Sequence, residues 1–392
     1  MVAGLVLLAT LGSASVVTPV YQIFCALFAF FFIDRIVGYV VRPKIRVTSQ
    51  FPDRTSARAP VQGTFKIENQ GRWTAYDVGV RFFQLPISIE QPDAEATLGQ
   101  ITPGRSLTTT LRLRPGRRGS YSLPRPRAYS TFPFHFFRDG RSKSETLTLL
   151  VLPHFHPLVR LDLPVGARYQ PGGIALTSNI GESPEYIGNR EYVAGDSARR
   201  IDYRSWARLG RPIVREYQEE YYCRVALVLD TFPAAGPKGR FRRKTNPAGD
   251  EQLEAAISLS ASIADALSRG EYLLDLFAAG PELYVFRAGR HTAHLENVLE
   301  ILACVDACRE NPFDKVSPAI SEELNNISTV VGVFLDWDAS RAQLARTAAE
   351  RGCSVVIYIV RDGETSEPIE FDEGRVIQIQ TDAIRSGGLE SL

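Results

Sequence analysis

The sequence predicts a multi-domain protein: an N-terminal transmembrane helical hairpin, a small antiparallel β-sandwich and a doubly wound α/β domain. Three observations predict this. No charged side chain occurs from Met1 to Ile33, residues 45–152 contain short strands of period two, and from Arg224 apolar strands alternate with helices. The boundaries follow as 1–41 for the hairpin, 42–152 for the sandwich, 153–222 for a connecting segment, 223–380 for the α/β domain and 381–392 for a tail.

The composition is that of a globular protein with balanced charge. Lys and Arg number 45 against 44 Asp and Glu, which leaves a net charge of +1, and 44% of the residues are hydrophobic. Nucleic-acid-binding chains carry a basic excess, so this balance argues against that class of partner. Five cysteines are too few for a disulfide scaffold and indicate reduced thiols.

The N-terminal apolar stretch is long enough for two membrane passes. As one straight helix it would extend about 60 Å, against about 30 Å of bilayer hydrocarbon. The turn-prone patch from Ser13 to Pro19 divides it into one pass around Val2 to Val17 and a second from Tyr21 onward. A cleavable signal peptide is the alternative. Such a peptide needs a basic start, and the first basic residue here is Arg35.

Basic residues directly follow the second pass and predict its orientation. Arg42, Lys44 and Arg46 should hold this flank on the cytoplasmic side of a bacterial inner membrane. Everything downstream is then expected to face the cytoplasm. We interpret Asp34 as an interfacial residue beside Arg35 and not as a proton relay, because the stretch contains no second acid.

The predicted sandwich consists of short, half-buried strands. They include Phe65–Glu68, Val78–Phe82 and Leu107–Leu113, and turn signals at 69–71 and 103–104 separate them. Such strands with frequent turns are typical of an antiparallel sandwich. We find no residue pattern for chemistry in this domain.

The predicted α/β domain places two acids where ligands of such sheets bind. Its expected elements are strand 224–230, helix 251–268, an edge hairpin of 272–277 and 283–286, a helix around Leu295 to Leu302, strand 329–336, helix 340–351 and strand 354–360. Asp230 and Asp336 each end an apolar strand. Ligands of doubly wound sheets sit beyond the carboxyl ends of the strands, so both acids are candidate site residues.

The segment before this domain carries a family resemblance. Residues 190–208, with Val214-Arg215-Glu216 beyond them, strongly resemble the signature of the bacterial Domain of Unknown Function 58 family. The predicted hairpin, Arg117-Arg118-Gly119 and residues 131–134 (Thr-Phe-Pro-Phe) are similar as well. Tyr203 departs from the family, which usually has Trp there. The resemblance implies that the α/β domain is von Willebrand factor A-like.

The resemblance also implies a degenerate metal-ion-dependent adhesion site. Related domains hold Mg²⁺ through a DxSxS loop and through a Thr and an Asp from later loops. Here Asp230 supplies the first acid, but Phe232 and Ala234 replace the two serines, and Thr292 and Asp336 would supply the later ligands. We expect no cofactor beyond weak Mg²⁺. The competing interpretation is a relic, in which Asp230 and Asp336 cap helices or bind backbone amides.

The resemblance implies a protein partner, a MoxR-type AAA+ ATPase. The chain would then be an adaptor or substrate in the assembly of an envelope-associated complex. The partner-binding residues would be Arg190, Gly195, Asp196, Arg199, Arg200, Asp202, Arg204, Arg208 and Arg215. For Arg200, Asp202 and Arg204 we favour a structural role, as ion pairs that lock domains together. Gly195 is expected to adopt positive φ.

Two other function classes remain open. One is a metal-assisted enzyme that acts on cell-envelope material at Asp230, and the other is a structural scaffold with no ATPase partner. The sequence contains no GxSxG, HExxH or GxGxxG motif, so no catalytic constellation, small-molecule substrate or nucleic-acid partner is indicated.

Weaker signals are interpreted structurally. The basic cluster 238–245 is not a P-loop, since Arg243 precedes Lys244; it is either solvated or in contact with acidic lipid headgroups or an acidic partner. We expect Cys304 and Cys308 to be core thiols and not zinc ligands. The histidine pairs 154/156 and 291/294 are expected to be ordinary surface pairs, because neither has an acid or cysteine at ligand spacing.

Overall fold

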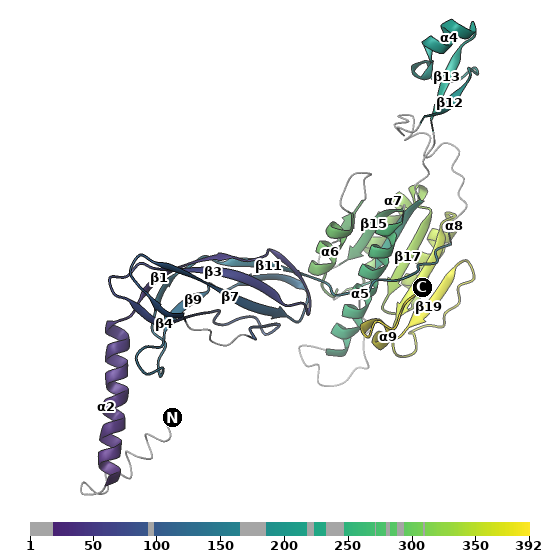
Figure 1. The fold of residues 1–392 in the computed structure, drawn as a ribbon. Helices are drawn as coiled ribbons and strands as arrows, with labels where there is room; N and C mark the ends of the chain where they lie inside the picture. The colour runs from purple at the N-terminus through teal and green to yellow at the C-terminus, as the bar shows by residue number, and fades with distance from the viewer. Residues whose placement is uncertain are drawn as a thin grey trace. The chain divides into compact units, whose positions relative to one another are not determined.

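The computed structural model divides into two compact units, Met1–His154 and Phe155–Leu392, which are described separately (Figure 1). It describes residues 19–92, 98–164, 186–217, 223–232, 247–270, 272–279, 283–287, 294–308 and 310–392.

The first unit begins with a long apolar helix, α2 (Pro19–Val40). Among the described residues it is the one helix long and apolar enough to cross a membrane, a property that membrane anchors and signal sequences share. Most of its side chains are exposed, so it is not the core helix of a globular domain. The first predicted pass, around Val2 to Val17, lies outside the described residues.

Three β-sheets form the rest of this unit around one hydrophobic core. Their strands are β1 (Lys44–Gln50), β2 (Arg54–Ser56), β3 (Val61–Asn69), β4 (Ala75–Arg81), β5 (Ile89–Glu90), β6 (Leu98–Ile101), β7 (Ser106–Pro115), β8 (Gly119–Leu123), β9 (Arg127–Ser130), β10 (Arg141–Lys143) and β11 (Leu147–Leu152). The sheet orders are β10-β1-β3-β7-β5, β2-β11-β8 and β6-β4-β9. Every second residue of β3 is buried, as the period-two pattern predicts. The strand pairs are antiparallel, as predicted, except β1 with β10 and β2 with β11, which are parallel.

A six-stranded sheet organises the second unit. Its strands are β14 (Cys223–Leu229), β15 (Tyr272–Ala279), β16 (Leu283–Phe286), β17 (Thr329–Phe334), β18 (Ser354–Val360) and β19 (Arg375–Ile379), in the order β16-β15-β14-β17-β18-β19. All neighbours are parallel except β15 and β16, so the predicted edge hairpin is confirmed. In this order the chain reverses its direction of winding between β14 and β17. That gap is the topological switch point of a doubly wound sheet.

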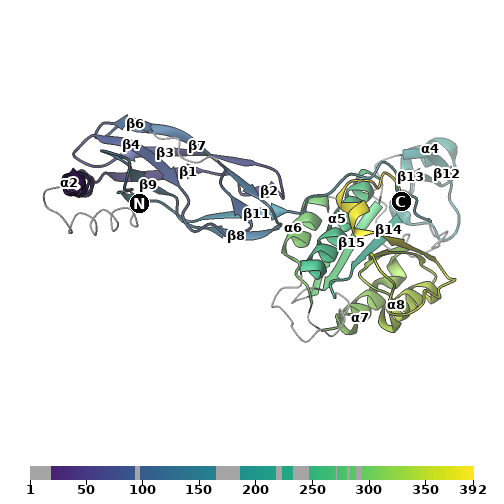
Figure 2. The ribbon, with the colours of Figure 1, turned by 90° about the horizontal axis from the view of Figure 1, so that it is seen from below.

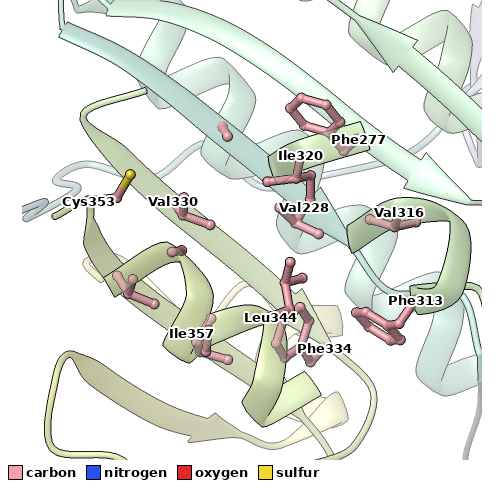
Figure 3. Packing of buried hydrophobic residues seen from close by; sticks show 14 of the residues in the cluster. Val228, Phe277, Phe313, Val316, Ile320, Val330, Phe334, Leu344, Cys353 and Ile357 are labelled. Carbon is pink, nitrogen blue, oxygen red and sulfur yellow. The ribbon is translucent and has the colours of Figure 1, made fainter. Parts of the chain in front are cut away.

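Helices cover both faces of this sheet (Figure 2). They are α5 (Pro247–Arg269), α6 (His294–Cys304), α7 (Phe313–Glu323), α8 (Ala339–Glu350) and α9 (Thr381–Arg385), and a 3₁₀ turn, η2 (Leu324–Asn326), follows α7. Helix α5 contacts α6 and α9, whereas α7 contacts α8 on the other face. Figure 3 shows the core beneath α7 and α8, where Phe313 and Ile320 meet Val228, Phe334 and Ile357 of the sheet. The strands are buried on both faces, which is why they appear in the sequence as continuous apolar runs.

The C-terminal residues belong to the second unit (Phe155–Leu392), here called the α/β unit, and do not form the tail that the sequence analysis expects. Ile384 of α9 is buried, and α9 packs on α5. Beyond it, the backbone amides of Val159 and Asp162 donate to the carbonyl groups of Glu390 and Leu392, at 2.8 and 2.7 Å. These short pairings connect the first and last residues of the unit.

Candidate functional site

Asp230 and Asp336 lie side by side at the carboxyl edge of the sheet, as the sequence predicts. Asp230 follows β14 and Asp336 follows β17 by two residues, and these strands pair with Leu229 opposite Val333. The amide of Asp230 donates to the carbonyl group of Val333 at 2.9 Å. Both carboxylates are buried, with relative exposures of 1% and 2%. The two acids therefore occupy the switch point, where ligands of doubly wound sheets bind.

An internal cation binds Asp230. Its Oδ2 accepts a hydrogen bond from Nε of Arg341 at 2.8 Å, and Nη2 of Arg341 lies 2.7 Å from the same oxygen. Both side chains are 1% exposed or less. Backbone amides complete the set: Phe232 donates to Oδ1 and Leu335 to Oδ2, both at 2.9 Å. Burial raises the pKa of the Asp230 carboxyl, while the charge of Arg341 and both amides act in the opposite direction.

The start of α8 positions Arg341 for this contact. Asp338 is the N-cap, and its carboxylate accepts from the backbone amide of Arg341 at 3.0 Å and also pairs with the guanidinium group. The guanidinium donates to the carbonyl group of Phe232 at 2.8 Å and lies over the ring of Phe313. With two carboxylates, a carbonyl group and an aromatic ring around it, the buried charge is compensated.

Asp336 binds the loop that follows β18. Its Oδ1 accepts from the amides of Trp337 and Ser366, at 2.8 and 2.9 Å, and its Oδ2 accepts from the hydroxyl of Ser366 at 2.5 Å. Nη1 of Arg361 lies 3.0 Å from Oδ1. Both acids thus bind backbone amides, as the relic interpretation expects, but Asp338 and not Asp336 caps α8.

These residues do not fit a Mg²⁺ ion. A hard cation needs several oxygen ligands directed at one point, whereas the carboxylate of Asp230 faces a guanidinium group, and the carboxylate of Asp336 faces a second one from Arg361. Within the described part of the chain, no group of three or more His, Cys, Asp or Glu side chains suits a metal. Thr292 and Ala234 of the expected site lie outside the described residues.

The sequence analysis does not single out Arg341, Arg361 or Ser366. Only Arg341 leaves a signal in the sequence. Position 341 is in the first turn of a predicted helix, where the helix dipole disfavours a cation. An arginine there is better stabilised when it has an acidic partner, although the sequence does not say which one.

The family-signature residues form a small substructure, here called the signature hairpin and defined as residues 186–217. Strands β12 (Tyr186–Glu191) and β13 (Ile213–Tyr217) pair antiparallel. Between them lie a 3₁₀ turn, η1 (Ala198–Arg200), and helix α4 (Tyr203–Leu209). Gly195 adopts φ of +114°, which confirms the predicted positive φ.

Asp202 organises the signature hairpin. As the N-cap of α4, it accepts from the amides of Arg204 and Ser205, and its other oxygen accepts from the Ser205 hydroxyl at 2.8 Å. Asn189 of β12 donates to the same carboxylate at 3.2 Å, and Arg215 of β13 lies 3.5 Å away. The hydrogen bond from the Ser205 hydroxyl is the largest cause that lowers the pKa of Asp202 to about 2. One carboxylate thus connects α4 to both strands.

A second carboxylate closes the turn before η1. Arg190 donates to both oxygens of Asp196 at 2.7 Å, and the amide of Val193 donates at 2.9 Å. The hydrogen bonds from Arg190 are the largest cause that lowers the pKa of Asp196 to about 2. Arg190, Asp196, Asp202 and Arg215 therefore have structural roles within the hairpin.

Other predicted partner-binding residues stay exposed. Asp202 binds the Arg204 amide and pairs with the side chain of Arg215, so the structural role of the Arg204 side chain stays a prediction. Arg199, Arg204 and Arg208 are exposed, and no ion pair in the described residues includes them; Arg200 is half-buried. Beside them, the rings of Tyr203 and Trp206 stack with centroids 6.1 Å apart and are 65% and 38% exposed. The hairpin thus displays arginines and aromatic rings together.

The signature hairpin is connected to the sheet at the amino ends of β14 and β17. The chain departs after Pro164, whose carbonyl group accepts from the hydroxyl of Thr329 at 3.3 Å, and returns at Cys223. Thr329 begins β17 and Cys223 begins β14. These two connection points are therefore separated from Asp230 by the length of β14, about 20 Å at roughly 3.3 Å per residue.

The remaining predictions concern two cysteines, a basic cluster and a histidine. Cys304 is exposed, so the expected core position of its thiol is wrong, whereas Cys308, half-buried beyond the end of α6, packs against the core. The basic cluster 238–245 and His291 lie outside the described residues. A shallow pocket of about 520 Å³ between Pro164 and Glu373 lies at the amino end of β18, away from Asp230.

Comparison with known proteins identifies one family. Residues 188–371 match the model described as "Protein of unknown function DUF58". No curated protein matches the chain. Similar solved structures include a CARDB domain from Pyrococcus furiosus (17% identity, 28% of this chain and 95% of that one, TM-score 0.18) and the SrpA adhesin from Streptococcus sanguinis (12%, 39% and 83%, TM-score 0.19). These scores are too low to support any argument about fold or function.

Proposed function

Because residues 188–371 make this chain a member of the DUF58 family, we propose that it is a membrane-anchored protein-interaction module. In this proposal α2 anchors the chain. The three β-sheets of the first unit, from Lys44 to Leu152 and here called the β unit, serve as spacer or docking surface. The α/β unit with its signature hairpin, of von Willebrand factor A-like type, binds another protein. The partner implied by the family resemblance is an AAA+ ATPase of the MoxR type. The ATPase would hydrolyse ATP, and this chain would be its adaptor or substrate.

The observation that carries the proposal is the exposed surface of the signature hairpin. Its acids Asp196 and Asp202 are used internally, whereas Arg199, Arg204 and Arg208 remain exposed. Arginine and aromatic side chains are enriched at protein interfaces, and the stacked Tyr203 and Trp206 adjoin these arginines. A surface of this composition suits an acidic protein partner.

Contacts of α2 support an anchor over a cleavable signal sequence. Asp34 accepts a hydrogen bond from the amide of Phe134 at 3.0 Å, and Arg35 pairs with Asp139 at 2.5 Å. The last turns of the helix are thus part of the folded β unit. Arg42, Lys44 and Arg46 follow the helix, which supports an inner-membrane protein whose folded units face the cytoplasm.

The first experiment identifies the partner. The full-length protein is purified from cross-linked membranes in mild detergent, and co-purifying proteins are identified by mass spectrometry. Recovery of an AAA+ ATPase supports the adaptor role. Recovery of envelope-synthesis proteins alone would favour a scaffold.

A charge reversal then tests the surface. Arg199→Glu with Arg200→Glu should abolish recovery of the ATPase without unfolding the protein. Arg105→Glu with Arg114→Glu is the matched control, since both of these arginines are exposed on the β unit. Equal recovery with both double variants would show that the signature hairpin is not the docking surface.

A further inference from the structure

The loop between β9 and β10 has an unusual surface. Residues 134–138 (Phe-His-Phe-Phe-Arg) are all exposed, and Phe134, Phe136 and Phe137 are each about 40% accessible. We define residues 131–139 as the aromatic loop. Three adjacent exposed phenylalanines form an apolar patch of the kind that marks protein or membrane contacts.

The aromatic loop is held in shape by the β unit. The amide of Thr131 donates to the carbonyl group of Asp77, and the amide of His135 donates back to Thr131 at 2.8 Å. The hydroxyl of Thr131 lies 2.7 Å from Nδ1 of His135, and the ring of Phe132 packs on Tyr76. These contacts fix the base of the loop, so its exposed rings project from a rigid support.

One stripe of α2 contacts this loop. The ring of Phe30 stacks on Phe134 with centroids 4.1 Å apart, and Phe31 lies 4.7 Å from Phe136. One and two turns further along α2, Asp34 and Gly38 are buried against the same loop. The contact is therefore a continuous packed interface along the helix.

The position of Phe30 fixes the depth of the loop. Phe30 lies ten residues before the end of α2 at Val40, or about 15 Å at 1.5 Å per residue, near the middle of the helix. The apolar span of this helix covers Gln22 to Val40. If α2 crosses a membrane, Phe134 and Phe136 cannot lie outside the bilayer.

The charged groups around the loop suit the headgroup region. Arg35 pairs with Asp139 and lies over the ring of Phe137 with its guanidinium carbon 5.5 Å from the centroid. Arg138 lies over Tyr129, and Arg42 donates to the carbonyl group of Gly140 at 2.9 Å. Arginines can extend to phosphate groups while neighbouring rings enter the acyl region.

We infer that the aromatic loop inserts Phe134, Phe136 and Phe137 into the acyl region of one phospholipid leaflet, beside α2. The inference rests on the proposed role of α2 as a membrane anchor. Asp34 and Arg35 interrupt an otherwise apolar helix, and charges at this depth need partners within the protein. The aromatic loop provides both partners: the Phe134 amide binds Asp34, and the Asp139 carboxylate pairs with Arg35. The β unit is thus seated in the membrane surface and not merely tethered to it.

Photo-cross-linking tests the insertion in the full-length protein. p-Benzoylphenylalanine replaces Phe136 or, in a second variant, Phe137, and the protein is reconstituted into vesicles of phosphatidylethanolamine and phosphatidylglycerol. After irradiation, phospholipid adducts are measured by mass spectrometry. Two positions are needed because the larger side chain at 136 can disturb the packing on Phe31.

Two control positions define the outcomes. Phe28, 57% exposed on α2, should give a lipid adduct, and Ile87, fully exposed on the β unit, should give none. We expect adduct yields at 136 and 137 close to that at Phe28 and several times that at Ile87. Yields at the level of Ile87, or cross-links only to residues 2–17 or to another protein, would overturn the inference. Absence of an adduct at Phe28 itself would instead refute the anchor role.

Discussion

The guanidinium group of Arg341 and the carboxylate of Asp230 form a buried ion pair at the switch point of the sheet, with Nη2 and Oδ2 2.7 Å apart. The family resemblance places a divalent cation beside this acid, whereas the structure places a side chain of the same chain there. An internal cation needs no supply of metal and is not lost by dilution. The carboxyl edge is therefore assembled when the unit folds.

Loss of one partner should destabilise the α/β unit strongly. Asp230→Asn leaves the Arg341 guanidinium buried without its full charge compensation, and breaking a buried pair in this way costs about 3–5 kcal/mol. Chemical unfolding followed by the fluorescence of the buried Trp337 measures the effect. The exposed pair Arg160–Asp162 gives the control, since Asp162→Asn should change stability by no more than about 0.5 kcal/mol.

Joint replacement of both partners should recover much of that loss. Asp230→Leu with Arg341→Met removes both buried charges, and exchange of a buried ion pair for apolar side chains is often neutral. The same unfolding measurement applies. If the double variant is as unstable as the sum of its two single variants, the two side chains do not act as a pair.

Millimolar Mg²⁺ should leave the melting temperature of the protein unchanged. The Arg341 charge already faces Asp230, so a divalent cation would be repelled from the site. Thermal unfolding with and without MgCl₂ checks this. A clear rise in the wild-type melting temperature that disappears in Asp230→Ala would establish a cation site in spite of Arg341.

Loss of the cap should loosen α4 selectively. Asp202→Ala removes the acceptor for the amides of Arg204 and Ser205, so amide hydrogen exchange in α4 should become severalfold faster. Mass spectrometry resolves exchange by segment. Asp196→Ala, which opens the preceding turn, should leave exchange in α4 nearly unchanged. Equal effects of both variants would argue against a specific cap.

The same acids predict the acid sensitivity of the signature hairpin. The pKa values of Asp196 and Asp202 are about 2 in the folded protein, below the ordinary value of 3.8. As the pH falls, the two carboxylates therefore take up protons at a higher pH in the unfolded hairpin than in the folded one. The stabilisation from both acids is complete well above pH 3.8 and is lost as the pH falls towards 2. NMR titration of the aspartate carboxyl carbons checks this, and midpoints near 3.8 would contradict it.

The aromatic pair should contribute most of the docking energy. Tyr203→Ala with Trp206→Ala should weaken binding of the partner about 30-fold or more, since interface hot spots are worth about 2 kcal/mol or more and are enriched in Tyr and Trp. Binding to the purified partner is measured by calorimetry. Trp73→Ala, at a residue 75% exposed on the β unit, should have no effect.

Sequence patterns predict what is local or periodic in this protein. The apolar strands before Asp230 and Asp336, the edge hairpin at β15 and β16, and α5 all follow from periodicity and composition. The position of both acids at one edge follows from parallel pairing alone. The positive φ of Gly195 is likewise a local property.

Contacts between distant segments could not be predicted in this way. Arg341 meets Asp230 across 111 positions, and Phe134 meets Asp34 across 100. No motif or characteristic spacing in the sequence marks either pair, because tertiary packing determines which residues meet. The partner of Asp202 could not be predicted for a related reason. Several acids and arginines lie close together in the signature, and only the geometry of the hairpin decides that Asp202 pairs with Arg215.

The segment that contains the signature hairpin leaves and rejoins the α/β unit at neighbouring points. Assembly of the sheet therefore does not depend on the length of this segment. The two described residues that flank this segment are Pro164, which contacts the first residue of β17, and Cys223, which begins β14. An insert that closes on itself costs the host little conformational entropy, and this cost grows only slowly with its length. The length of this segment can therefore change at little cost to the core of the α/β unit.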